Sequence, residues 1–159
     1  MKRTPQDEKV IGRMAPGVLS RGGFLGDDRR SLAEILAADR AAVEALGLTH
    51  ARIADALDAA CRAAMSALGA PVHLPGTNRV AEYHEAMGRI ASPWPDGRTF
   101  AKGEIVLADP ASGESVVFTP LSVHLIRAHG FYQGRGSCYR LEPAKLARVL
   151  GLERKERKP

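Results

Sequence analysis

The sequence predicts one α+β domain, with an N-terminal helical hairpin, a small antiparallel sheet of about four strands and a C-terminal helix-loop-helix. Three observations support this class. Residues 31–69 carry apolar side chains at helical spacing, residues 71–119 alternate β-rich runs with turn sequences, and residues 120–152 return to helix start and stop signals. A chain of 159 residues has the length of one domain and buries about two thirds of the surface that its unfolded chain exposes. The fold therefore needs neither a disulfide nor a metal.

Residues 1–30 are expected to form an extended N-terminal arm. The segment holds five glycines and two prolines and has no apolar periodicity. Its apolar side chains, Val18, Leu19, Phe24 and Leu25, are expected to anchor the arm on the domain.

Two helices are predicted within residues 31–69. "SLAE", which begins at Ser31, is a capping box, and Gly47 suits the position that follows the first helix. Thr49 starts the second helix, whose apolar stripe runs to Gly69. Because the connection is so short, the two helices are expected to form a hairpin. Its many alanines permit close approach, so the hairpin is the candidate surface for a homo-oligomer.

Strands are predicted between residues 71 and 119. "VHL" precedes the turn sequence "PGTN", while residues 79–90 fit both the helical and the strand period. Because the "VHL" strand needs a partner, we favour a β-hairpin with Gly88 as a bulge, and leave a helix as the alternative. The runs 104–108 and 115–119 flank a Pro- and Gly-containing loop and predict a second hairpin.

The C-terminal region predicts two short helices. Thr119 can cap the first, with Pro120 at its first position and Gly130 after its last turn. The second is expected from Pro143 to Leu150, and residues 153–159 form a charged tail.

The charge of the chain is unevenly distributed. Residues 120–159 carry nine Lys or Arg against three Asp or Glu, whereas residues 31–119 carry seven against eleven. This asymmetry indicates an acidic partner, either a protein surface or a nucleic acid. Two cysteines are too few for a secreted disulfide framework, and no apolar run is long enough to cross a membrane. We therefore expect a cytoplasmic protein without a membrane partner.

The stretch "SVHLIRAHGFYQGRGSCYR", residues 122–140, gathers residue types that often form sites. His124 and His129 are five residues apart, which separates their directions by about 140° on a regular helix. They are therefore no same-face pair; a metal site would need them to converge with Cys138 and either His73 or His84. The ordinary interpretation makes His124 a partly buried histidine bonded to a carboxylate or the backbone, and His129 a residue stabilised at a helix C-terminus.

The sequence gives less support to a phosphate-binding loop or to nucleophilic catalysis. "GFYQGRGS" matches neither the Walker A motif nor the dinucleotide-binding motif, and the preceding element is a helix. Ser137 lies in "GRGS", which is not a nucleophile elbow. Cys61 lies on an apolar stripe and is expected to be buried, and Trp94, between two prolines, is expected to close over the edge of a core. No catalytic residue and no cofactor is assigned.

The leading hypothesis is a non-catalytic binding or accessory protein that contacts an acidic partner through its basic C-terminal surface. The residues expected to make these contacts, or to hold a phosphate, are Arg127, Tyr132, Arg135 and Arg140. One alternative is a nucleic-acid-binding protein, because arginines lie beside aromatic residues there. The other is a small enzyme or metal-binding protein that uses His124, His129 and Cys138.

Overall fold

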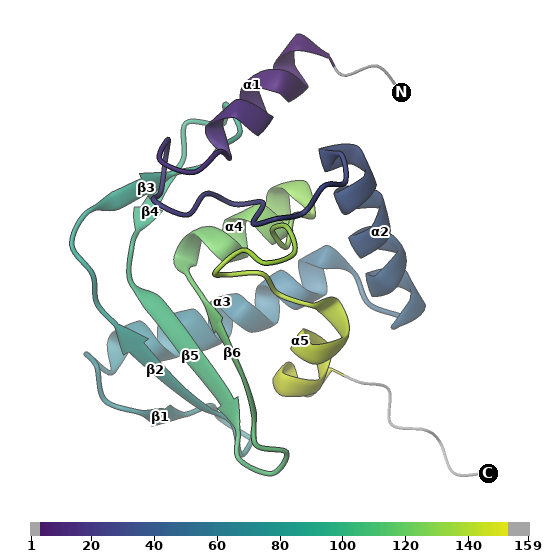
Figure 1. The fold of residues 1–159 in the computed structure, drawn as a ribbon. Helices are drawn as coiled ribbons and strands as arrows, with labels where there is room; N and C mark the ends of the chain where they lie inside the picture. The colour runs from purple at the N-terminus through teal and green to yellow at the C-terminus, as the bar shows by residue number, and fades with distance from the viewer. Residues whose placement is uncertain (1–3, 153–159) are drawn as a thin grey trace.

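The computed structural model describes residues 4–152 and shows an α+β fold, which confirms the predicted class (Figure 1). The helices are α1 (Pro5–Arg13), α2 (Leu32–Ala45), α3 (His50–Ser66), α4 (Pro120–His129) and α5 (Pro143–Leu150). The strands are β1 (Val72–His73), β2 (Val80–His84), β3 (Arg89–Ala91), β4 (Thr99–Ala101), β5 (Glu104–Asp109) and β6 (Glu114–Phe118). The predicted charged tail, residues 153–159, lies outside the described residues. Within residues 4–152, no helix combines the length and the apolar character needed to cross a bilayer.

The main sheet is antiparallel and has the order β1-β2-β5-β6, so the expected four-stranded sheet is confirmed. Ile105 lies opposite Phe118 and Leu107 opposite Val116, and all four side chains are buried. Since side chains alternate across a strand, this register directs them to one face. Helices α3 and α5 contact the sheet and contribute to the same hydrophobic core.

The ambiguous segment 79–90 contains two strands that belong to different sheets. β2 pairs with β1 on one edge and with β5 on the other, so neither edge is left for β3. The chain passes Gly88, which has a φ of 94°, and β3 then pairs with β4 in a separate two-stranded sheet. The expected hairpin of the "VHL" strand with this segment is confirmed, because it forms between β1 and β2. The expected continuation of the second strand through Gly88 as a bulge is wrong, because the chain leaves the main sheet there and β3 pairs with β4.

The two helices of the N-terminal hairpin begin where the sequence predicts. The hydroxyls of Ser31 and Thr49 accept backbone N–H groups at the starts of α2 and α3. The helices find their main helical partners elsewhere: α3 packs along α4, and α2 contacts α5. Cys61 is buried, as predicted.

The N-terminal arm is not wholly extended, because residues 5–13 form α1. Thr4 and Asp7 make a reciprocal capping box, and Pro5 occupies the first turn. Val10 and the following Met14 are buried, and this burial offsets the cost of ordering the segment. This helix could not be predicted from the apolar pattern of the sequence, because its apolar face is so narrow. Of the expected anchors, Phe24 is buried, whereas Val18 is 56% exposed.

Helix α4 lies between two hydrophobic clusters. Leu121 and Leu125 belong to the cluster formed with α1 and α2, while Val123 and Ile126 belong to the larger core with α3 and the sheet. The helix is therefore held on two sides, which fixes the direction of its remaining face.

Candidate metal centre at the end of helix α4

Asp96, His124 and His129 form a cluster on the remaining face of α4. His124 Nε2 lies 2.8 Å and His129 Nε2 3.0 Å from the same oxygen, Asp96 Oδ2. The three side chains are 23%, 12% and 19% exposed respectively. The donor atoms all lie within 4.8 Å of one another, so these residues are close enough to share one metal ion.

Asp96 comes from the turn between β3 and β4. The Ser92 hydroxyl donates to Asp96 Oδ2 and accepts the backbone N–H of Trp94, while the Arg98 backbone N–H donates to Asp96 Oδ1. These bonds fold the turn on itself and hold the carboxylate against α4. The sequence "PDG" predicts the turn but not the role of its aspartate, because aspartate is an ordinary turn residue.

Both histidines come from one helix, and the capping of that helix sets their positions. Thr119 and Ser122 form a capping box at the start of α4, and Gly130, with a φ of 61°, ends the helix directly after His129. The prediction that the two rings point away from each other is therefore wrong, because both contact Asp96. The 140° angle describes Cα–Cβ directions, whereas the rings reach beyond Cβ and both turn to Asp96, with centroids 5.6 Å apart.

Aromatic side chains enclose the cluster. The Trp94 ring stacks on His129 with centroids 4.1 Å apart and planes 7° apart, and its edge meets Phe131. Phe100 packs against His124 at 5.1 Å. Trp94 thus covers the edge of the smaller core, as predicted, and it also fixes the plane of a candidate ligand.

The surroundings of Asp96 favour its charged form. Burial, the largest single influence, acts to raise its pKa, but hydrogen bonds from His129, His124, the Arg98 backbone and Ser92 outweigh it, so the pKa lies well below its ordinary value. The cluster therefore presents a carboxylate to two imidazoles near neutral pH.

The donor set fits a transition metal of the zinc class. Bonds of about 2.0–2.2 Å in a tetrahedral site separate the ligand atoms by about 3.3 Å. Moving both imidazoles outward by about 0.4 Å would bring the two nitrogen–oxygen pairs to that spacing. Three protein ligands leave one tetrahedral position for water or substrate, as in catalytic zinc sites.

An open groove runs beside the cluster, between α2 and α4. Its volume is about 730 Å³, and His129 lines it together with His50, Arg40, Glu44 and Arg127. Ala33, Ala37 and Ala41 of α2 also line the groove. Solvent-accessible space of a size typical for ligands therefore reaches the edge of the cluster.

The other metal candidates from the sequence lie apart from this site. Cys138 is exposed and lines a different cavity. His73 and His84 are both exposed on the main sheet, in β1 and β2. Among residues 4–152, the group that could share a metal ion consists of Asp96, His124 and His129.

Two of the four expected contact residues are internal. Tyr132 is 1% exposed, with its hydroxyl 2.9 Å from His50 Nδ1. The Arg140 guanidinium donates to both oxygens of Asp39, at 2.5 and 2.8 Å, and also to the Gln133 carbonyl. These side chains hold the loop 130–142 in place rather than presenting a surface.

The other two expected contact residues lie on the surface. Arg127 pairs with Asp55 at 2.8 Å. Arg135 has an exposed side chain, and its backbone N–H donates to Asp28. The hypotheses of an acidic protein partner and of nucleic-acid binding therefore stay predictions, which rest on these two arginines and on the overall charge.

No family model, curated protein or solved structure matches this chain in comparisons with known proteins.

Proposed function

We propose that the protein binds one divalent transition metal through Asp96, His124 Nε2 and His129 Nε2. The observation that carries this proposal is the convergence of two imidazole nitrogens on one carboxylate oxygen, at 2.8 and 3.0 Å. A site this small, with side chains mostly withdrawn from water, suits an ion better than an organic ligand.

The ligand types indicate which metals to test. Two imidazoles with one carboxylate suit Zn²⁺, and the same set with open positions is typical of non-haem Fe²⁺. Calcium and magnesium prefer sites made of oxygen ligands. The proposal therefore names Zn²⁺ first and Fe²⁺ second.

The number of ligands supports a chemical role for the metal over a purely structural one. Structural zinc sites are closed by four protein ligands, whereas three leave a position at which a metal can activate water or polarise a carbonyl. The groove along His129 gives a small substrate room to approach. We thus favour a small metal-dependent enzyme, and the reaction class to test first is hydrolysis.

The test is a titration of chelator-treated full-length protein with Zn²⁺, and with Fe²⁺ under anaerobic conditions, followed by calorimetry. We expect saturable binding of one ion per chain and a rise in melting temperature. At a free metal concentration of 100 times Kd the stabilisation would be about 2.7 kcal/mol. Asp96→Asn, His124→Ala and His129→Ala should each abolish stoichiometric binding.

Two control variants distinguish metal binding at this cluster from metal binding at other histidine or cysteine side chains. His73→Ala removes an exposed histidine outside the cluster, and Cys138→Ala removes the thiol that the sequence placed among the metal candidates. Both variants should bind as tightly as the unmodified protein. Absence of saturable binding, or binding that persists in His129→Ala, would overturn the proposal.

A further inference from the structure

A second cavity lies near the start of α4, and none of the three candidate metal ligands lines it. Its volume is about 280 Å³. Its lining includes Arg21, Phe24, Ile90, Leu121, Gln133 and Cys138. The arm, the smaller sheet, α4 and the loop 130–142 therefore meet around it.

Gln133 brings a buried amide to this cavity. The residue is 4% exposed, and its φ of 69° lies in the left-handed region that residues other than glycine seldom adopt. Its backbone carbonyl accepts from Arg140, and its Oε1 accepts from the Ser137 hydroxyl. Surrounding contacts thus hold a strained conformation, which is a common property of ligand-binding residues.

The other end of this amide is free. Gln133 Nε2 has no hydrogen-bond partner among residues 4–152, whereas in this range every fully buried side-chain nitrogen or oxygen has one. The Gln133 amide nitrogen therefore keeps some accessible surface, and Gln133 is one of the residues that line the cavity. One polar group in the wall is left ready to bond a ligand.

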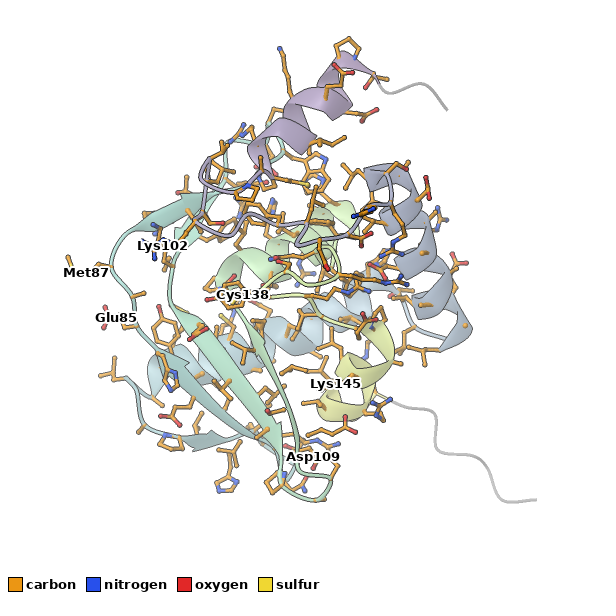
Figure 2. The ribbon with its side chains drawn as sticks, viewed as in Figure 1. Glu85, Met87, Lys102, Asp109, Cys138 and Lys145 are labelled. Carbon is orange, nitrogen blue, oxygen red and sulfur yellow. The ribbon has the colours of Figure 1, made fainter. Side chains whose placement is uncertain are left out.

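The charged side chains that line the cavity indicate the charge of the ligand that it would bind. Arg21 and Lys102 line the cavity, and no Asp or Glu does. Neither cation forms an ion pair within residues 4–152. Thr119, the N-cap of α4, adds the positive end of the helix dipole. Figure 2 labels Lys102 toward the left of the molecule, Cys138 near its middle and Lys145 on α5, on the other side of Cys138 from Lys102.

The remaining wall is apolar, since Phe24, Ile90 and Leu121 contribute to the smaller core and also line the cavity. We propose that this cavity binds a small organic anion: a carboxylate or phosphate monoester attached to an apolar group about the size of one ring. The anionic group lies toward Arg21, Lys102 and the Gln133 amide, and the apolar group lies against Phe24 and Leu121.

The test compares three probes in calorimetry with the full-length protein: benzoate, phenyl phosphate and the neutral benzyl alcohol. At least one anion is expected to bind, and benzyl alcohol is expected to bind at least about tenfold more weakly. The preferred anion shows which of the two groups fits. The bound anion should also slow the alkylation of Cys138 by iodoacetamide, because this thiol lies in the wall.

Two variants test the location. Gly22→Leu adds a bulky side chain at a residue that lines the cavity, at a position where an added Cβ meets no atom within 4 Å. It should abolish binding without disturbing the fold. Lys102→Glu replaces an attraction by a repulsion and should weaken binding by about tenfold.

The matched controls are Gly12→Leu, which also enters open space, and Lys145→Glu, which reverses an exposed lysine outside the cavity. Both should bind the anion normally. His129→Ala should also bind it normally, which separates this cavity from anion binding at a metal.

Failure of both anions to bind would overturn the proposal. Equal binding of benzyl alcohol would also overturn it, as would binding that survives in Gly22→Leu and Lys102→Glu.

Discussion

Of the four side chains that the sequence assigned to a contact surface, the side chain of Arg140 is the most strongly bound. Its side chain is 9% exposed, that of Asp39 is 5% exposed, and Glu142 adds a third carboxylate contact. Burial acts to lower the pKa of Arg140, but its bonds to Asp39 and Glu142 raise it overall. This arginine ties the loop 130–142 to α2.

Asp39→Ala should therefore destabilise the protein strongly. The substitution leaves the Arg140 charge buried with one partner fewer, and breaking such a pair costs about 3–5 kcal/mol. Urea denaturation measures the change in the free energy of unfolding. Asp58→Ala is the control, because Asp58 pairs with Arg62, whose side chain is 80% exposed, and should cost less than about 1 kcal/mol. Similar losses in the two variants would contradict the assignment.

The two thiols should differ in reactivity. Cys61 is buried in the main core, and burial, followed by the nearby Asp58, raises its pKa to about 11. Cys138 is exposed. Iodoacetamide at neutral pH should therefore modify Cys138 first, as seen by mass spectrometry, and should reach Cys61 only after denaturation. Modification of Cys61 at the same rate in folded protein would show that the core around α3 opens readily.

At the scale of elements, the N-terminal arm and the loop 130–142 bind each other through their backbones. The Asp27 N–H donates to the Arg135 carbonyl, and the Gly134 N–H donates to the Phe24 carbonyl. A Cβ at Gly134 would collide with the Leu25 backbone. The glycines that resembled a phosphate-binding loop in the sequence thus permit two chain segments to approach closely.

Asp28 should make this contact sensitive to acid. Its carboxylate accepts from the Arg30 side chain and from the Arg135 backbone, and the bond from Arg30 is the main reason that its pKa is lowered. Because the folded pKa lies below the unfolded value of about 3.9, the stabilisation is complete above that value. It is lost as the pH falls toward the folded pKa.

Asp28→Asn should therefore cost about 1.5–3 kcal/mol at pH 7, and this difference should shrink as the pH falls below about 4. Denaturation at pH 7 and near pH 3 measures both values. Asp55→Asn, which changes an exposed carboxylate paired with Arg127, should cost less than about 1 kcal/mol at pH 7. A pH-independent cost at Asp28 would show that the charge has no part in the contact.

Most elements could be predicted because their ends carry local signals. Thr119, Pro120 and Gly130 define α4 without help from the rest of the chain, and the hairpin of β5 and β6 follows from its alternation and loop. The pairing of β3 with β4 could not be predicted, because it depends on whether an edge of β2 is free, and that is a property of the assembled sheet.

At the scale of the whole molecule, α4 joins two hydrophobic clusters, and α2 and the loop 130–142 also contribute residues to both. The smaller cluster includes Trp94, and the larger includes most of the buried face of α3. Residues of α4 alternate between the two, so neither cluster keeps its packing if this helix unfolds. The two clusters should therefore unfold together.

This cooperativity can be measured with two probes. Trp94, the single tryptophan, reports the smaller cluster by fluorescence, and far-UV circular dichroism reports the helices, including α3. The two urea transitions should coincide in midpoint and slope, as two-state unfolding requires. Leu125→Ala removes a buried side chain from the smaller cluster and should reduce the free energy of unfolding by about 2–5 kcal/mol. Both midpoints should therefore fall together. Separated transitions would show that the clusters unfold independently.

The candidate metal centre could be predicted only in part from the sequence. His124 was expected to be partly buried and bonded to a carboxylate or the backbone, and the structure shows it bonded to Asp96. This partner could not be predicted from the sequence, because Asp96 lies 28 residues earlier. Its local sequence indicates a turn but no contact with His124.

Local chemistry therefore determined the α+β class, the ends of most helices, the main hairpin and the burial of Cys61, because capping, periodicity and turn residues act over a few positions. The tertiary structure decided which charges are buried, which strands share a sheet, and that two histidines on different sides of an ideal helix meet at one carboxylate. These outcomes depend on contacts between distant segments, and a carboxylate 28 residues away leaves no mark on the local pattern around His124.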